Sequence, residues 1–113
     1  MDNFYKAQKA YREALKRINV KENEKIVLEC KNVYWCSHFA ANIPEADIKA
    51  HENVILQLKD PGCSIVFARD VLGANIEEHF KVVVNSGIKI WLDNFIEVVN
   101  YKNTKVEEWL LYI

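Results

Sequence analysis

The chain has 113 residues, of which 50% are hydrophobic and 27% are charged, a composition typical of one soluble domain with an apolar core. Its 15 basic side chains oppose 16 acidic ones, and this near balance argues against a nucleic-acid binder of the usual basic kind. No apolar run approaches the roughly 18 residues that a membrane span needs. We therefore expect neither a nucleic acid nor a membrane as its main partner.

A period of 28 residues runs through the sequence. When residues 31–58 are aligned without a gap on residues 59–86, seven positions are identical: Lys31/Lys59, Phe39/Phe67, Ala40/Ala68, Ala46/Ala74, Ile48/Ile76, His51/His79 and Val54/Val82. The flanking segments keep the same apolar columns more loosely. A fixed period of this length indicates stacked repeats. We therefore divide the chain into four units, 3–30, 31–58, 59–86 and 87–113, which form a single predicted domain.

Each unit is predicted to contain two helices. Trp35, Phe39 and Ile43 are spaced i, i+4, i+8, which is a helical stripe. The second helix of each unit begins at a short polar side chain that can act as an N-cap: Asn19, Asp47, Asn75 and Asn103. No segment is a convincing strand. The predicted fold is all-α, an α-solenoid of about four helix-pair repeats with roughly eight short helices. The repeated columns predict a core of Phe39, Phe67, Phe95, Trp35, Trp91, Ile43, Val71, Ile48, Ile76, Val54 and Val82.

Unit one carries a basic cluster on and after its first helix. Its members are Lys6, Lys9, Arg12, Lys16, Arg17 and Lys21. A terminal repeat covers its outer face with polar groups, so we interpret the cluster as a solvated capping surface. The alternative is a nucleic-acid-binding surface, which the acidic neighbours Glu13, Glu22 and Glu24 disfavour.

The histidines and cysteines are the side chains that could carry chemistry. His51 and His79 share a column, and we expect them to bridge adjacent repeats through hydrogen bonds, with a ligand or catalytic role as the alternative. Cys30, Cys36 and Cys63 are expected to be buried thiols, because their number is odd and no pair has two-residue spacing. Unpaired thiols indicate a reducing compartment, hence the cytoplasm.

No motif in the chain predicts catalysis. There is no nucleophile–histidine–carboxylate order and no glycine-rich phosphate loop. We therefore predict no catalytic residue, no metal site and no cofactor.

The exposed positions of the central second helices are the predicted partner-binding surface, because these columns vary most between units. They are Lys49, Glu52, Asn53, Gln57, Glu77, Phe80, Lys81 and Asn85. Phe80 is an aromatic residue where the other units carry Glu24, Glu52 and Glu108. It is either an interface anchor or a side chain that packs on a neighbouring helix.

Unit four ends in five successive apolar residues, 109–113. Leu110 and Leu111 match core columns, so Trp109 and Ile113 face elsewhere on the helix. Contiguous exposed apolar residues often mark contacts. We therefore predict a homodimer through Trp109 and Ile113, unless the last helix bends back and buries them.

The segment 67–76, preceded by Asp60-Pro61, carries a recognisable pattern. It resembles short helical repeats of the form D-P…F-A-x-x-[IV]-x-G-A-[DN]-I, which recur in bacterial and bacteriophage proteins. Unit three matches best, and unit two matches with Pro44-Glu45 in place of Leu72-Gly73. The outer units match only in their apolar and capping columns. The resemblance implies a helical solenoid and a prokaryotic or phage setting, and it transfers no catalytic residue.

The predicted function is a non-catalytic protein-interaction module. One form of this hypothesis is a phage-type inhibitor that binds and blocks a bacterial protein in the host cytoplasm. The alternative is a nucleic-acid-binding solenoid that uses the basic first unit.

Overall fold

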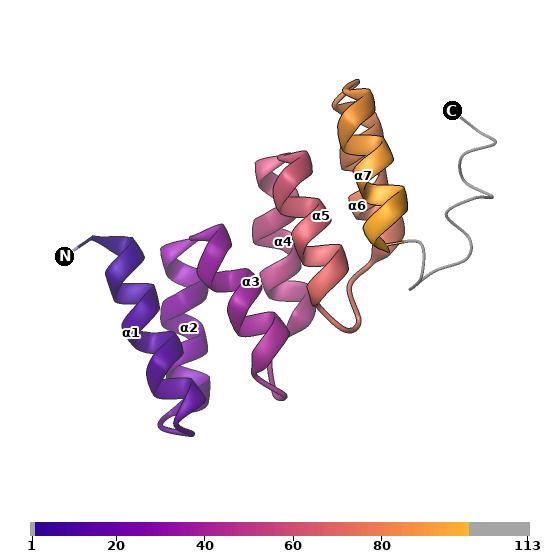
Figure 1. Ribbon diagram of the computed structural model, residues 1–113. Coiled ribbons are helices and arrows are strands. Elements are labelled where there is room, and N and C mark those ends of the chain that lie inside the picture. The colour runs from indigo at the N-terminus through magenta and orange to yellow at the C-terminus, as the bar shows by residue number, and fades with distance from the viewer. Residues whose placement is uncertain (1, 100–113) are drawn as a thin grey trace.

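The computed structural model describes residues 2–99 and is helical over that range (Figure 1). This part contains seven helices: α1 (Asn3–Leu15), α2 (Val20–Cys30), α3 (Val33–Asn42), α4 (Ile48–Leu58), α5 (Pro61–Asp70), α6 (Ile76–Asn85) and α7 (Lys89–Val99). The prediction of an all-α fold is confirmed for these residues. The expected eighth helix falls in residues 100–113, outside the described part of the chain.

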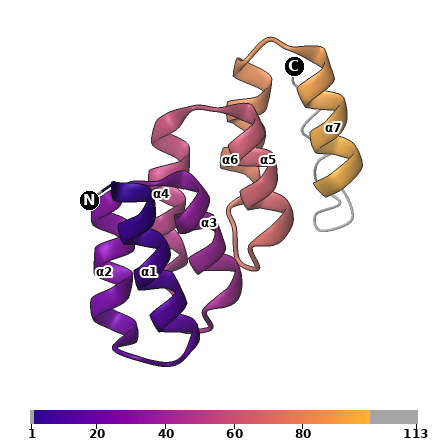
Figure 2. The same cartoon turned by 60° about the vertical axis from the view of Figure 1, so that its left-hand side comes forward.

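The helices lie side by side in two layers (Figures 1 and 2). Helices α1, α3, α5 and α7 contact one another in succession, and α2, α4 and α6 do the same behind them. Each of the first three units also packs its first helix against its second. Neighbours in sequence are therefore neighbours in space, and the array reaches 46 Å along its longest axis.

The second helices of units one and two end with the same backbone conformation. Lys31 and Lys59, an identical pair, end α2 and α4 in the left-handed region, at φ 51° and 56°. In each, the amide N–H donates to the carbonyl three residues earlier, at 3.2 Å. This closes the helix and turns the chain into the next unit.

Side-chain caps begin most of the helices. Asn32 and Asp60 accept hydrogen bonds from the amides of Trp35 and Cys63, both at 3.0 Å, at the starts of α3 and α5. Asp60 also precedes Pro61, and proline is well tolerated in the first turn because that turn lacks acceptors for its N–H groups.

Two of the four predicted second-helix caps are confirmed. Asp47 accepts from the Ala50 amide at 3.1 Å, and Asn75 accepts from the Glu78 amide at 3.3 Å. The prediction is wrong for Asn19, whose side chain makes no capping bond. Its backbone lies at φ 43° and ψ 54°, whereas a side-chain cap normally requires extended backbone. Asn103 is outside the described residues.

The phenylalanine column is fully buried, as predicted. Phe39, Phe67 and Phe95 are each 0% exposed, and Trp35, Ile43 and Val71 are also buried. The four β-branched residues of the second-helix columns, Ile48, Val54, Ile76 and Val82, are half-buried. They belong to helices that keep one side toward solvent in an array only two helices thick.

The predicted burial of Trp91 is wrong, since 37% of it is exposed. Its ring lies over α5, where a Cβ atom added to Gly62 would lie 3.4 Å from Trp91 Cη2. The glycine lets the ring rest on the helix surface without entering the core.

No helix within residues 2–99 is long and apolar enough to cross a membrane.

Truncation of the phenylalanine column tests the repeat register. Phe67→Ala should lower the free energy of unfolding by about 3–5 kcal/mol, because it leaves a cavity at a fully buried site. Urea unfolding followed by circular dichroism measures the loss. Leu72→Ala is the control, since Leu72 is 88% exposed, and it should change stability by less than about 0.5 kcal/mol. Equal effects of the two substitutions would contradict the register.

Candidate functional site

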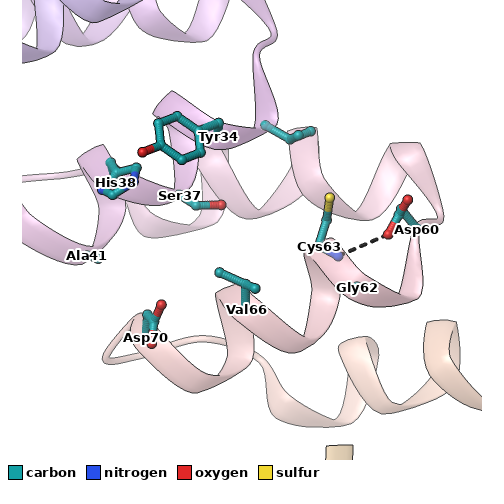
Figure 3. Close-up of a pocket in the computed structure, with 10 residues that line it drawn as sticks. Tyr34, Ser37, His38, Ala41, Asp60, Gly62, Cys63, Val66 and Asp70 are labelled. Atoms are coloured by element: carbon teal, nitrogen blue, oxygen red, sulfur yellow. Dashed lines mark hydrogen bonds between the residues drawn. The ribbon is translucent and has the colours of Figure 1, made fainter. Parts of the chain in front are cut away.

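A groove of about 320 Å³ lies between α3 and α5, on the layer of first helices (Figure 3). One wall comes from α3, with Val33, Tyr34, Ser37, His38 and Ala41. The other comes from α5 and its cap, with Asp60, Gly62, Cys63, Val66 and Asp70. Figure 3 shows Cys63 and Val66 pointing from α5 toward α3. The groove therefore separates units two and three along their first helices.

The groove exists because unit three supplies small side chains where its neighbours supply large ones. In one column Gly62 stands between Tyr34 of unit two and Ile90 of unit four. In the next column Cys63 stands between Trp35 and Trp91. The small side chains border open space on the side of α5 that faces α3, while the Trp91 ring lies over Gly62.

The polar side chains that line the groove include two carboxylates, Asp60 and Asp70. Asp60 Oδ1 accepts from the Cys63 amide (dashed in Figure 3), and Arg69 donates to both oxygens of Asp70, at 2.7 and 2.9 Å. Within residues 2–99, no lysine or arginine lines the groove. The groove therefore presents apolar walls with acidic ends.

The Cys63 thiol in this groove is a poor nucleophile. Partial burial, followed by the neighbouring Asp60 carboxylate, raises the pKa of Cys63 above its ordinary value. The thiol is therefore protonated at neutral pH, and the thiolate is the reactive form. Cys63 acts here as a small apolar side chain of the wall.

Exposed aromatic rings continue the groove toward the N-terminal end of the array. Tyr34 is 52% exposed and stacks on Phe4, with ring centroids 6.1 Å apart. It also meets His38 edge-on at 4.4 Å. Large rings that are held by neighbours and still reach solvent are the side chains that protein interfaces favour.

The predicted surface on the second helices is only partly exposed. Lys49, Asn53, Gln57, Glu77, Lys81 and Asn85 are exposed, and their role in binding stays a prediction. The expected exposure of Glu52 and Phe80 is wrong, since they are 6% and 5% exposed. Phe80 packs on Phe95, with ring centroids 5.6 Å apart, as its alternative interpretation held.

Glu52 is buried because it connects two repeats. One of its oxygens, Oε2, lies 2.8 Å from His79 Nε2 and accepts from the Asn75 amide at 2.6 Å. The same arrangement occurs one unit earlier, where Glu24 Oε2 lies 3.0 Å from His51 Nε2 and accepts from the Asp47 amide at 2.7 Å.

We call Glu24, His51 and the Asp47 amide the first joint, and Glu52, His79 and the Asn75 amide the second joint. Both histidine side chains are 0% exposed. The prediction that these histidines bridge adjacent repeats is confirmed. The glutamate partners were not predicted, although Glu24 and Glu52 share a column 27 residues before each histidine.

The other two cysteines, Cys30 and Cys36, do not line the groove. Cys36 is fully buried, and burial raises the pKa of its thiol to about 12. Cys30 and Cys36 are free thiols. Within residues 2–99, no three His, Cys, Asp or Glu side chains gather closely enough to hold a metal ion.

Removal of the Glu52 carboxylate tests the second joint. Glu52→Ala should lower the free energy of unfolding by about 1–3 kcal/mol, because His79 loses its only carboxylate partner among the described residues. Glu77→Ala is the control, since it removes an exposed carboxylate from the first turn of α6, the helix that carries His79. Thermal unfolding of both variants measures the difference. Equal melting temperatures would show that the joint adds nothing to stability.

Trp109 and Ile113 lie outside the described residues, so the dimer interface stays a prediction. Comparisons of the chain with protein-family models, with curated proteins and with solved structures find no match.

Proposed function

We propose that the chain is an α-solenoid of about four helix-pair repeats and works as a non-catalytic protein-interaction module. The groove between α3 and α5 carries this proposal, because it is the place where large, partly exposed rings border open apolar space. Helical solenoids commonly bind extended partners along one face. In this proposal the main binding surface lies on the first helices, whereas the sequence pattern predicted it on the second helices.

The proposed ligand is a short polypeptide segment that inserts one large apolar side chain and places a basic residue beside it. Its apolar side chain would contact Tyr34, Val66 and Cys63 on the two walls. The groove volume of about 320 Å³ is at the lower end for a ligand pocket, which suits a side chain better than a whole cofactor. The basic residue would lie near Asp60, because no lysine or arginine of residues 2–99 lines the groove.

One form of the proposal is an inhibitor that blocks a bacterial protein in the cytoplasm of a phage-infected cell. Its support is the resemblance of units two and three to repeats of bacterial and bacteriophage proteins. In this form the inserted side chain belongs to the blocked protein.

A nucleic-acid-binding function is the alternative, and one contact favours it. Glu24 is an acidic neighbour of the basic cluster, yet its carboxylate bonds His51 and the Asp47 amide, so it does not pair with the cluster. Against it, Arg17 of the cluster pairs with Glu45 of unit two. Binding to plain duplex or single-stranded DNA that weakens steeply with salt would support the alternative.

Selection from a random-peptide display library tests the groove, because it requires no candidate partner at the outset. Selected peptides should share one large apolar residue next to a lysine or arginine. Val66→Asp should weaken their binding at least about tenfold, because it puts a charge on the apolar wall. Isothermal titration calorimetry measures the affinity.

Leu58→Asp is the matched control for this substitution. Leu58 is an exposed apolar residue at the end of α4, so the same change of chemistry is made on the layer of second helices. Its affinity for the selected peptides should equal that of the wild type. Loss of binding in Leu58→Asp alone would return the binding surface to the second helices.

A homodimer through the C-terminal segment is proposed separately. Wild-type protein should elute and scatter light as a dimer, and Trp109→Glu combined with Ile113→Glu should be monomeric with unchanged helical content. A wild-type chain that is monomeric at high concentration would contradict the dimer.

A further inference from the structure

The two joints differ at one atom. In the second joint, His79 Nδ1 lies 3.0 Å from the Ser64 hydroxyl. In the first joint, His51 Nδ1 is buried and has no hydrogen-bond partner among the described residues. The residue equivalent to Ser64 in unit two is Cys36, whose thiol contacts the Val27 carbonyl oxygen at 3.8 Å. One substitution between repeats therefore leaves one ring nitrogen unpaired.

The glutamate of each joint sets the state of its histidine ring. A carboxylate oxygen accepts a hydrogen bond, so Nε2 carries the proton, and Nδ1 of the neutral ring carries a lone pair. A serine hydroxyl can donate to that lone pair, and it can accept from Nδ1–H if the ring gains a second proton. Ser64 can therefore bond His79 in either protonation state, whereas the Cys36 thiol contacts the Val27 carbonyl oxygen and makes no bond with His51 Nδ1.

A second proton on His51 would be buried without an acceptor. The ring is 0% exposed and stacks on Phe39, with ring centroids 5.0 Å apart. The groups that face it are Glu24 from α2, Phe39 from α3 and Asp47 at the start of α4. Burial lowers the pKa of His51 below its ordinary value of 6.5, although Glu24 and Asp47 oppose the shift.

We propose that the first joint is an acid-sensitive element, which releases unit one from the rest of the array on mild acidification while the second joint still holds. In the unfolded or released state His51 gains a proton below about pH 6.5. In the packed state it stays neutral to a lower pH. The stabilisation is therefore complete above pH 6.5 and is lost as the pH falls below it.

Release of unit one would expose a specific reporter. Trp35 of α3 packs on Phe4 and Tyr11 of α1, at centroid distances of 5.4 and 5.5 Å. Its emission should shift to the red when α1 leaves. The double substitution Trp91→Phe and Trp109→Phe makes Trp35 the only tryptophan and serves as the common background.

Reciprocal substitutions test the proposal on that background. Cys36→Ser gives the first joint the hydroxyl that the second joint has, and the acid midpoint of Trp35 emission should fall to a lower pH. Ser64→Cys removes the hydroxyl from the second joint. In this variant the pH midpoint of Trp35 emission should stay as in the parent protein. The pH at which the helical circular dichroism signal is lost should rise.

The size of the effect follows from proton linkage. Uptake of one extra proton on release raises the equilibrium constant for opening by up to about tenfold per pH unit below pH 6.5. The parent protein should show this slope in Trp35 emission at constant denaturant, and Cys36→Ser should flatten it. The same midpoint in both proteins would overturn the proposal, because the acid response would then come from the carboxylates.

A direct titration keeps the proposal testable if a variant does not fold. Nitrogen-15 spectra of the wild-type imidazoles report the protonation state of each ring as the pH is lowered. His51 should remain the neutral Nε2–H tautomer below pH 6.5 while the array is intact. A His51 ring that takes up its second proton in the packed state at pH 6.5 or above would overturn the proposal.

Discussion

The structure depends on a carboxylate that serves two repeats at once. In each joint a single glutamate oxygen accepts a bond from the histidine of the next unit and from the backbone amide at the start of its second helix. The first few amides of a helix have no intrahelical acceptor. A local capping box would satisfy them from within the same unit. Here the acceptor comes from the unit before, so a helix cap also fixes the stacking distance between repeats.

The joints explain features that look unrelated in the sequence. They account for the histidine column, since a buried carboxylate requires a donor close to it. The series stops at Phe80, which occupies the glutamate column and packs on Phe95 instead. Phe80 and Phe95 belong to a second core cluster, separate from the cluster that holds Phe39 and Phe67.

The groove arises from the same repetition by a local departure from it. Stacking brings α3 and α5 together at a spacing set by the core, whichever side chains lie on their outer surface. Cys63 then borders open space in the column where the flanking units carry Trp35 and Trp91, while the Trp91 ring lies over Gly62. A groove made in this way needs no change of the backbone, because the joints and the phenylalanine column hold the helices in place.

The sequence by itself determined the period, because aligned units repeat the same residue types. It also determined the helical class, the phenylalanine core and the caps at Asp47 and Asn75, because these follow from spacing within one unit. It also placed His51 and His79 in one column. The tertiary structure decided what those columns face. Glu52 lies in a column that varies between units and was therefore predicted to be exposed, but the stacking of units two and three places it against His79. The groove likewise needed the structure, because Gly62 and Cys63 become a cavity only when α3 and α5 stand side by side. Contacts between repeats join residues about 27 positions apart, so the spacing of residues within one helix cannot predict them.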